Sequence, residues 1–372
     1  MKKIIVHVLF LLAYAGLLLG YHQLADFERP ADYPEGLEYA RATVVEVLES
    51  DMGTDPDYDY IRIGKQKLRV EITSGAYRGK TVEVMNFVTR TTQLEGREGT
   101  RYIIGSYDGY FTANVMSYER SGLVVILLAA FLGLVICYGK RKGIAAVAAL
   151  IVTLLNVVFL FIPMLINGVP AVLAAMVVVL LSTLYTMVVL NGWTEKSMIA
   201  TASCTLCTAF AGIAAWAVGR FGAVTTLNTP EVEDLLFITE NSGFRIDNLL
   251  TAGILIASMG AVMDTCMSIV SALFEIKEQK PGITAADLLT SGLNIGRDIM
   301  GTMTNTLILA FAGSSINLMV IYYMYCMPAI SLLNTDFLVV EMVKGLISSM
   351  AVVISIPVAS MMTTAVIGRK KR

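Results

Sequence analysis

Residues 169–190 read VPAVLAAMVVVLLSTLYTMVVL, a run without a single charged side chain. Similar apolar runs extend from Ile4 to Tyr21 and from Leu123 to Tyr138. A helix needs about 20 consecutive apolar residues to cross the ~30 Å hydrocarbon layer of a bilayer. These runs therefore predict helices that span a membrane.

The composition of the whole chain agrees with this interpretation. Of its 372 residues, 56% are hydrophobic and 16% are charged. The mean hydropathy of +0.68 is far above what a water-soluble domain needs to fill a core. The net charge of -2, without a basic stripe, argues against nucleic-acid binding. The lipid bilayer is thus the expected environment of the chain.

The sequence contains no motif of a familiar enzyme mechanism. H-E-x-x-H, G-x-S-x-G and the P-loop are all absent. The only histidines, His7 and His22, lie in or beside the first apolar run, which argues against a zinc hydrolase with histidine ligands. None of the five cysteines lies in residues 26–119, so no disulfide framework stabilises that segment. We expect neither an enzyme nor a cofactor.

We predict eight spans in three domains. Residues 1–25 form an N-terminal transmembrane anchor, because the apolar run exceeds the roughly 7 to 15 residues usual in a cleaved signal peptide, which is the alternative. Residues 26–119 form a β-rich domain, and residues 120–372 form a seven-helix transmembrane domain. The predicted spans are 4–21, 122–138, 143–165, 170–190, 197–219, 248–274, 298–327 and 337–367.

The distribution of Lys and Arg predicts the orientation, because cytoplasmic connections carry an excess of these residues. With the N-terminus inside, the short outer connections contain only Arg220 and Arg245. Both termini are then cytoplasmic, and residues 26–119 are extracytoplasmic. The inner segments carry Lys2, Lys3, Lys140, Arg141, Lys142, Lys196, Lys277, Lys280, Arg297, Arg369, Lys370, Lys371 and Arg372.

Residues 26–119 are rich in β-branched and aromatic residues that often alternate with polar ones. Glycine-containing stretches such as Ser74–Gly79 and Asp108-Gly109 supply turns between them. A small OB-like barrel fits this pattern, and a β-sandwich is the alternative. The predicted strands are 42–48, 60–72, 80–88, 101–107 and 110–118.

Two connections between spans have amphipathic patterns. Outside, Thr229-Pro230-Glu231 supplies an N-cap, a proline and an acidic first turn. Inside, Thr284 to Asp287 forms a T-x-x-D capping box that opens a short helix. We expect both helices to lie along the membrane surface, where they cover the rim of the bundle or gate it.

Polar residues also occur inside the predicted spans, where a charge costs about 2.5 to 3.5 kcal/mol. Asp264 lies roughly 15 Å from the cytoplasmic end of its span and Asn305 roughly 12 Å into the next one. Ser268 and Thr302 are each one turn away from them on the same helix face. Together with a threonine stripe in the fifth span, these residues predict one polar cavity, and hydrogen-bonded helix packing is the alternative. That threonine stripe consists of Thr201, Thr205 and Thr208.

Four charged residues lie near the ends of the last two spans. Arg297 and Asp298 stand at the entry of the seventh span, where snorkelling and first-turn capping account for them, with a role in binding the substrate or ion as the alternative. Glu341 and Lys344 are three residues apart in the eighth span and can neutralise each other. Either this ion pair never moves, or a passing ion or proton opens it.

Two further motifs have a structural and a functional interpretation. Cys204-Thr205-Leu206-Cys207 matches C-x-x-C. Because it lies in an apolar helix rich in alanine, we interpret it mainly as a site of close helix packing. Thiol or metal chemistry is the alternative. The seventh predicted span is too long for the bilayer, so Gly313-Ser314-Ser315 either breaks it or the helix tilts.

Several stretches of the chain occur in an order that is typical of one family of membrane proteins. They are Ser74–Lys80, Gly260–Asp264 with Ser268, Gly296–Asp298 with Thr304–Leu307, and Glu341–Lys344 with Pro357. In these stretches the chain resembles the YibE/F-like family of bacterial multi-pass membrane proteins. This resemblance implies a plasma-membrane protein suspected of transport, without a settled substrate. Many members carry two adjacent acids where this chain has Met263-Asp264, and Arg is common at the position of Lys344.

A secondary transporter or permease of a small solute or ion is the function expected from these residues. Asp264 would respond to an ion or proton, because removal from water disfavours its charged form. The alternative is a membrane scaffold or accessory protein that binds a partner through its β domain. The expected partners are the bilayer, an unidentified solute or ion, and a second copy or another membrane protein.

Overall fold

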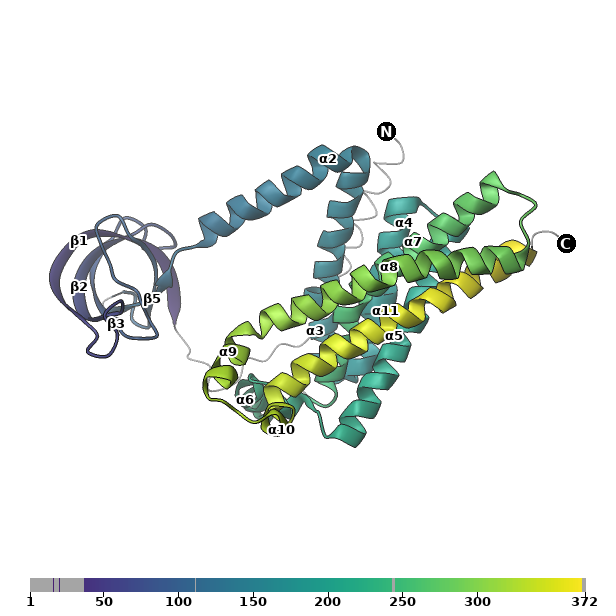
Figure 1. Ribbon diagram of the computed structural model, residues 1–372. Coiled ribbons are helices and arrows are strands. Elements are labelled where there is room, and N and C mark those ends of the chain that lie inside the picture. The colour runs from purple at the N-terminus through teal and green to yellow at the C-terminus, as the bar shows by residue number, and fades with distance from the viewer. Residues whose placement is uncertain (1–15, 17–19, 21–36, 111, 243–244, 370–372) are drawn as a thin grey trace. The chain divides into compact units, whose positions relative to one another are not determined.

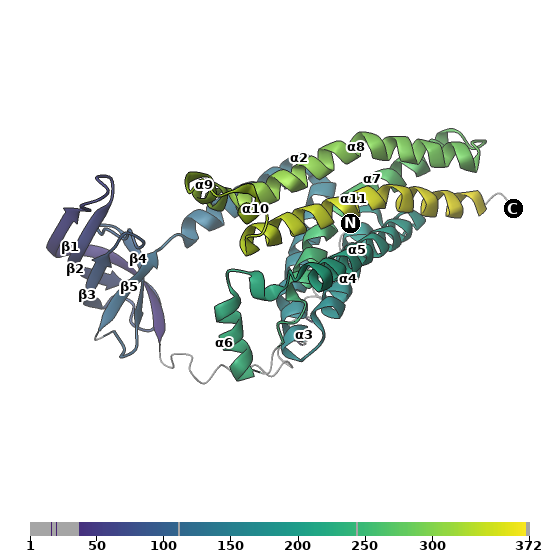
Figure 2. The same ribbon diagram turned by 60° about the horizontal axis from the view of Figure 1, so that its bottom comes forward.

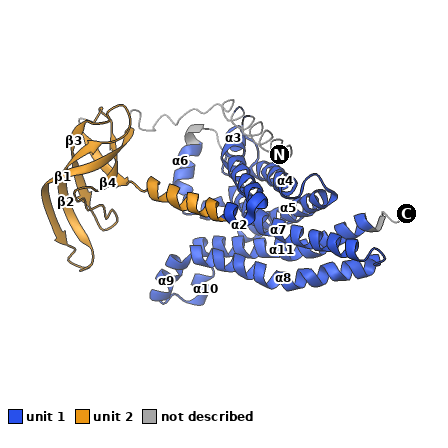
Figure 3. Cartoon of the chain, turned by 90° about the horizontal axis from the view of Figure 1, so that it is seen from above, with its two compact units in different colours: residues 1–30, 135–372 blue, residues 31–134 orange. Residues whose placement is uncertain are grey.

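The computed structural model describes residues 1–372 except 1–15, 17–19, 21–36, 111, 243–244 and 370–372. The predicted anchor at 4–21 therefore falls almost entirely outside the described residues. The chain divides into two compact units, residues 31–134 and residues 1–30 with 135–372 (Figure 3). Each unit is described by itself.

The unit of residues 31–134 contains a closed five-stranded barrel with the strand order β1-β2-β3-β5-β4. All neighbouring strands are antiparallel except β3 and β5, which run parallel. The predicted barrel is thus confirmed and the sandwich alternative is wrong. The strands are β1 (Glu38–Thr54), β2 (Arg62–Ile72), β3 (Thr81–Val88), β4 (Arg101–Ser106) and β5 (Ala113–Tyr118).

The interior of the barrel follows from the alternation along each strand. Leu68, Val70 and Ile72 of β2 all point inward and are fully buried. Two polar side chains also lie inside, and they satisfy each other because the Asn86 amide donates to Gln66 Oε1 at 3.2 Å. The Gln66 amide in turn donates to the carbonyl of Gly96 at 3.1 Å. The loop before β4 is therefore held to the barrel interior by hydrogen bonds.

An arginine fastens the loop between β1 and β2. Arg90, which follows β3, donates from Nε to Asp55 Oδ2 at 2.5 Å and from Nη2 to Oδ1 at 2.9 Å. The same guanidinium also contacts Asp57. Asp55 is buried, so its charge needs this partner. The hydrogen bond from Arg90 lowers the pKa of Asp55 below its ordinary value of 3.8.

We expect Arg90→Met to lower the thermal stability of the barrel most at neutral pH. A lowered folded-state pKa contributes stability above the unfolded pKa, and this contribution is lost as pH falls through the folded value. The deficit of the variant should therefore shrink below about pH 4. Thermal unfolding of the full chain, followed through the near-ultraviolet circular dichroism of the barrel tyrosines, checks this.

Arg97→Met is the matched control, since Arg97 is exposed and forms no ion pair in the part of the chain that the structure describes. It should change little at either pH. A deficit of Arg90→Met that stays the same at pH 7 and pH 3 would contradict the assignment to Asp55.

The unit of residues 1–30 and 135–372 is a bundle of long apolar helices, and α2 belongs to the other unit up to Leu134 (Figure 3). Among the described residues, five helices are long and apolar enough to cross a membrane, or six if the bent pair α8 and α9 is one span. The helices are α2 (Ser121–Asn156), α3 (Ile162–Ile166), α4 (Ala171–Asn191), α5 (Glu195–Gly222), α6 (Val232–Ser242), α7 (Leu249–Gln279), α8 (Ala285–Ser314), α9 (Ile316–Met324), α10 (Ala329–Leu332) and α11 (Asp336–Arg369).

The second and third predicted spans lie in one long helical stretch, Ser121–Ile166, with a break inside it. Lys140 has non-helical backbone angles, φ 49° and ψ -122°, so the helix turns at the predicted boundary. Glycine at position 143 permits this turn, because a Cβ there would lie 2.2 Å from the carbonyl oxygen of Val135. A π-helical turn, Val157–Phe161, precedes α3.

Helix α7 lies at the centre of the bundle and packs against α4, α5, α8 and α11. Helices α8 and α11 run side by side in both views (Figures 1 and 2). Their close approach depends on Gly296, where a Cβ would lie 2.1 Å from Cγ2 of Ile356. The core of the bundle therefore combines small residues with large aliphatic ones.

One predicted element is corrected by the structure. Thr284 is the expected N-cap, and its hydroxyl accepts from the Asp287 amide at 3.1 Å. The helix that it opens does not stop after a short surface segment but continues as α8 to Ser314. The apolar face of residues 285–296 packs on the bundle through Leu288, Gly292 and Gly296, which explains why the helix continues. The helix predicted after Thr229-Pro230-Glu231 is confirmed as α6.

Candidate functional site

The residues expected around Asp264 lie on the outside of the described bundle. Asp264 and Ser268 are exposed on α7, and Thr302 and Asn305 are exposed on α8. The opposite face of α7 carries the buried residues that pack against its neighbours. These four side chains therefore enclose no cavity among the described residues.

The threonine stripe of α5 has a different environment. Thr201 and Thr208 are buried, and their hydroxyls donate to carbonyls of their own helix, Ser197 at 2.8 Å and Cys204 at 2.8 Å. The hydroxyl of Thr205 is buried without a partner among the described residues. The stripe thus faces the core, whereas Asp264 does not.

The charged residues at the start of the seventh predicted span are exposed on α8. Arg297 donates to the side chain of Asn294 at 3.2 Å. Within the described part of the chain, neither Arg297 nor Asp298 has an ion pair. Because α8 begins at Ala285 with Thr284 as its N-cap, Asp298 lies in the interior of the helix and the predicted first-turn capping is wrong.

Glu341 and Lys344 form the predicted ion pair. Nζ of Lys344 lies 2.6 Å from Oε1 of Glu341, and each side chain is 28% exposed. Ser314 at the end of α8 donates to the other carboxylate oxygen, Oε2, at 3.5 Å. The pair therefore joins α11 to the end of α8.

The same region contains a break in the seventh predicted span. Helices α8 and α9 meet at an angle of 63°, and Ser315 caps the end of α8. The predicted break at Gly313–Ser315 is confirmed.

A cavity of about 410 Å³ and a smaller one of about 190 Å³ occur among the described residues. The smaller cavity lies at the break, between α8, α9 and α11, and its walls include Phe311, Ser315, Glu341 and Gly345. Ser315 is only 8% exposed, and its hydroxyl has no hydrogen-bond partner in the described structure. Carboxylate and hydroxyl oxygens at a helix break can bind a cation or exchange a proton. We call this cavity, with its ion pair, the helix-break site.

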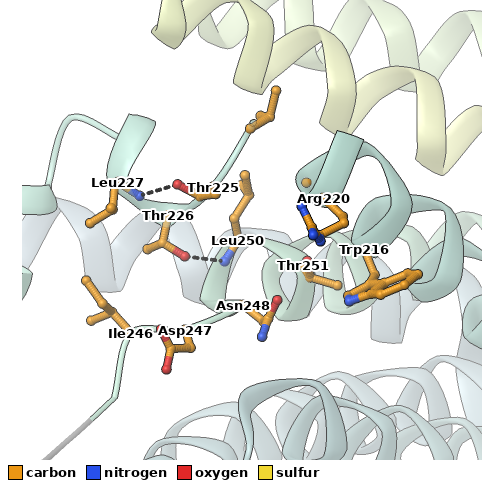
Figure 4. Close-up of a pocket in the computed structure, with 12 residues that line it drawn as sticks. Trp216, Arg220, Thr225, Thr226, Leu227, Ile246, Asp247, Asn248, Leu250 and Thr251 are labelled. Atoms are coloured by element: carbon orange, nitrogen blue, oxygen red, sulfur yellow. Dashed lines mark hydrogen bonds between the residues drawn. The ribbon is translucent and has the colours of Figure 1, made fainter. Parts of the chain in front are cut away.

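The larger cavity lies at the end of α5 and the beginning of α7 (Figure 4). Trp216 and Arg220 of α5 and Asn248 and Thr251 of α7 line it. From the sequence, Arg220 contributed only to the predicted orientation of the chain in the membrane, and this cavity was not predicted. The one available signal was the i, i+4 spacing of Trp216 and Arg220, which places both on one helix face.

The C-x-x-C motif faces the core. Cys204 and Cys207 are fully buried, and Sγ of Cys204 lies 3.7 Å from the hydroxyl of Thr183 on α4. No group of three or more His, Cys, Asp or Glu side chains that could hold a metal ion occurs among the described residues. The motif thus contributes to helix packing in this structure.

Residues 127–369 match the family model described as YibE/F-like protein. No curated protein and no solved structure matches the chain.

Proposed function

The chain belongs to the YibE/F-like family, and from this premise we propose that it is a secondary transporter in the bacterial plasma membrane, carrying a small solute or ion. The apolar helices support insertion into a bilayer. Counting the stretch Ser121–Ile166 as two spans, the bent pair as one and residues 1–25 as an anchor gives eight spans. In this topology both termini are cytoplasmic and the barrel is extracytoplasmic.

The observation that carries the proposal is the helix-break site. An ion pair inside a membrane span is costly to insert and usually marks a functional position. Here the pair lies beside a 63° break between two helices, and Glu341 lines a cavity there. Discontinuous helices of this kind form ion and substrate sites in secondary transporters.

Binding of a proton or cation to Glu341 can be coupled to a movement of the helices around it. A proton or a monovalent cation on the carboxylate removes its attraction for Lys344 and for the hydroxyl of Ser314. The contact between Glu341 of α11 and Ser314 at the end of α8 is then weakened. The bent pair can move relative to α11, which is the two-state element that alternating access requires.

Asp264 remains a second proposed ion-responsive group, with Ser268, Thr302 and Asn305 as its polar neighbours. Because these side chains face outward from the described bundle, their use in transport requires another element to cover them.

That same exposure favours a second function, an accessory protein that binds a membrane partner. Gly253, Ala257 and Gly260 continue the exposed stripe of α7 toward its N-terminus. A Cβ at Gly253 or Gly260 would meet nothing within 4 Å. Small residues around a polar one are typical of helix–helix contacts in membranes.

The experiment that separates the two functions is the accessibility of Ser315→Cys. A background in which the five native cysteines are alanine avoids competing thiols. We expect a membrane-impermeant maleimide to label the new cysteine from either side of the membrane, because alternating access opens the cavity to both sides in turn. Labelling from one side only, under all ion and pH conditions, would favour the accessory protein.

A further inference from the structure

The larger cavity is a separate site with its own chemistry. It has a volume of about 410 Å³ and lies within the helical unit, between the last turn of α5, the segment Thr225–Leu227 and the first turn of α7. Figure 4 shows Trp216, Arg220, Thr251 and Asn248 together around one side of it. In the proposed topology this end of α5 is extracytoplasmic.

Several hydrogen-bond donors in this cavity lack a partner among the described residues. Thr251 is only 6% exposed, and its hydroxyl forms no hydrogen bond in the described structure although it lines the cavity. Asn248 precedes α7 with φ 59° and makes no side-chain cap. Arg220 likewise forms no ion pair with any described residue. The hydroxyl of Thr251 is therefore open to the cavity, where a bound group can accept a hydrogen bond from it.

The other polar groups of the cavity are already engaged. The hydroxyl of Thr226 accepts from the Leu250 amide at 3.1 Å, and that of Thr225 accepts from the Leu227 amide at 3.3 Å. The one carboxylate in the wall, Asp247, is bonded to Arg245 at 2.6 Å and 3.0 Å. These contacts leave the guanidinium of Arg220 as the uncompensated charge.

The local field therefore favours an anion. The positive end of the α7 dipole adds to the charge of Arg220, because Leu250 and Thr251 in the first turn of α7 line the cavity. An arginine side chain matches a carboxylate or phosphate group through two parallel hydrogen bonds. The indole of Trp216 and the side chain of Leu250 supply apolar walls.

We propose that this cavity binds a small organic oxyanion, with Arg220 and Thr251 donating to its charged group and Trp216 contacting its apolar part. The oxyanion can belong to a soluble solute or to the headgroup of an anionic lipid. This site is distinct from the helix-break site, and binding to it does not depend on transport.

The test is equilibrium binding of benzoate and phenyl phosphate to the full chain in nanodiscs, measured by quenching of tryptophan fluorescence and by calorimetry. Phosphatidylcholine nanodiscs are compared with nanodiscs containing phosphatidylglycerol. We expect saturable binding that Arg220→Gln weakens by about tenfold or more. Thr251→Val, which removes the hydroxyl and keeps the shape, should weaken it by about three- to tenfold. Arg141→Gln is the control, because Arg141 is exposed and lies outside the cavity.

Each outcome decides the proposal. Binding in both kinds of nanodisc, lost in Arg220→Gln and kept in Arg141→Gln, establishes a site for a soluble oxyanion. Binding that phosphatidylglycerol abolishes in the wild type assigns the same site to the lipid headgroup. No saturable binding in phosphatidylcholine, or equal affinities of the wild type and Arg220→Gln, would overturn the proposal. A gradient is never applied, so failure here leaves the transport proposal untouched.

Discussion

Replacing Gly296 with alanine is expected to lower the free energy of unfolding of the helical unit by about 1 to 3 kcal/mol, the usual cost of overpacking. The added Cβ would lie 2.1 Å from Cγ2 and 3.0 Å from Cβ of Ile356. Ile356 is 4% exposed and has no free space to move into. Helices α8 and α11 must therefore separate, which also strains the contact between Ser314 and Glu341.

The matched control lies on the same helix. Gly301 is exposed, and a Cβ there would meet nothing within 4 Å. Gly301→Ala should be neutral or stabilising by up to about 1 kcal/mol, because alanine favours helix more than glycine does. Unfolding in mixed micelles of increasing denaturing detergent compares the two variants. Equal stabilities would contradict the close contact between α8 and α11.

Elements with a strong periodic pattern could be predicted from the sequence. The β-branched and alternating pattern of residues 60–72 identified β2, because such a pattern is typical of a strand with one buried face. The apolar runs identified the long helices, and Lys140 in its charged, glycine-flanked segment marked the turn inside α2. The ion pair of Glu341 and Lys344 followed from helix geometry alone, since residues three apart are neighbours.

Features that depend on which helix faces which could not be predicted in this way. Asp264 and Ser268 do lie on one face of α7, as predicted. Which elements lie opposite that face is set by the packing of α4, α5, α8 and α11 around α7. The cavity beside Arg220 joins the end of one helix to the beginning of another. No local pattern encodes such a contact, so both the exposure of Asp264 and this cavity required the structure.

The second large effect is expected at Glu341. Glu341→Gln keeps the size of the side chain and removes the charge that attracts Lys344, 2.6 Å away. A glutamine can neither take up a proton nor hold a monovalent cation by charge, so flux coupled to either should fall by about tenfold or more. Because Glu341→Gln leaves Lys344 without its carboxylate partner, the variant is compared with the wild type at matched protein incorporation.

Glu233→Gln is the control for this substitution. Glu233 lies in the first turn of α6 and is exposed, with no ion pair among the described residues. It removes the same charge at a position away from the helix-break site, so its flux should equal that of the wild type.

The most direct measurement is proton, sodium and potassium flux into proteoliposomes, with an enclosed pH dye or cation-sensitive dye, at matched protein incorporation. We expect the wild type and Glu233→Gln to carry protons or one of these cations at the same rate. Glu341→Gln should be slower by about tenfold or more. Flux in Glu341→Gln equal to that of the wild type, or no flux above empty vesicles in any of the three proteins, would contradict it.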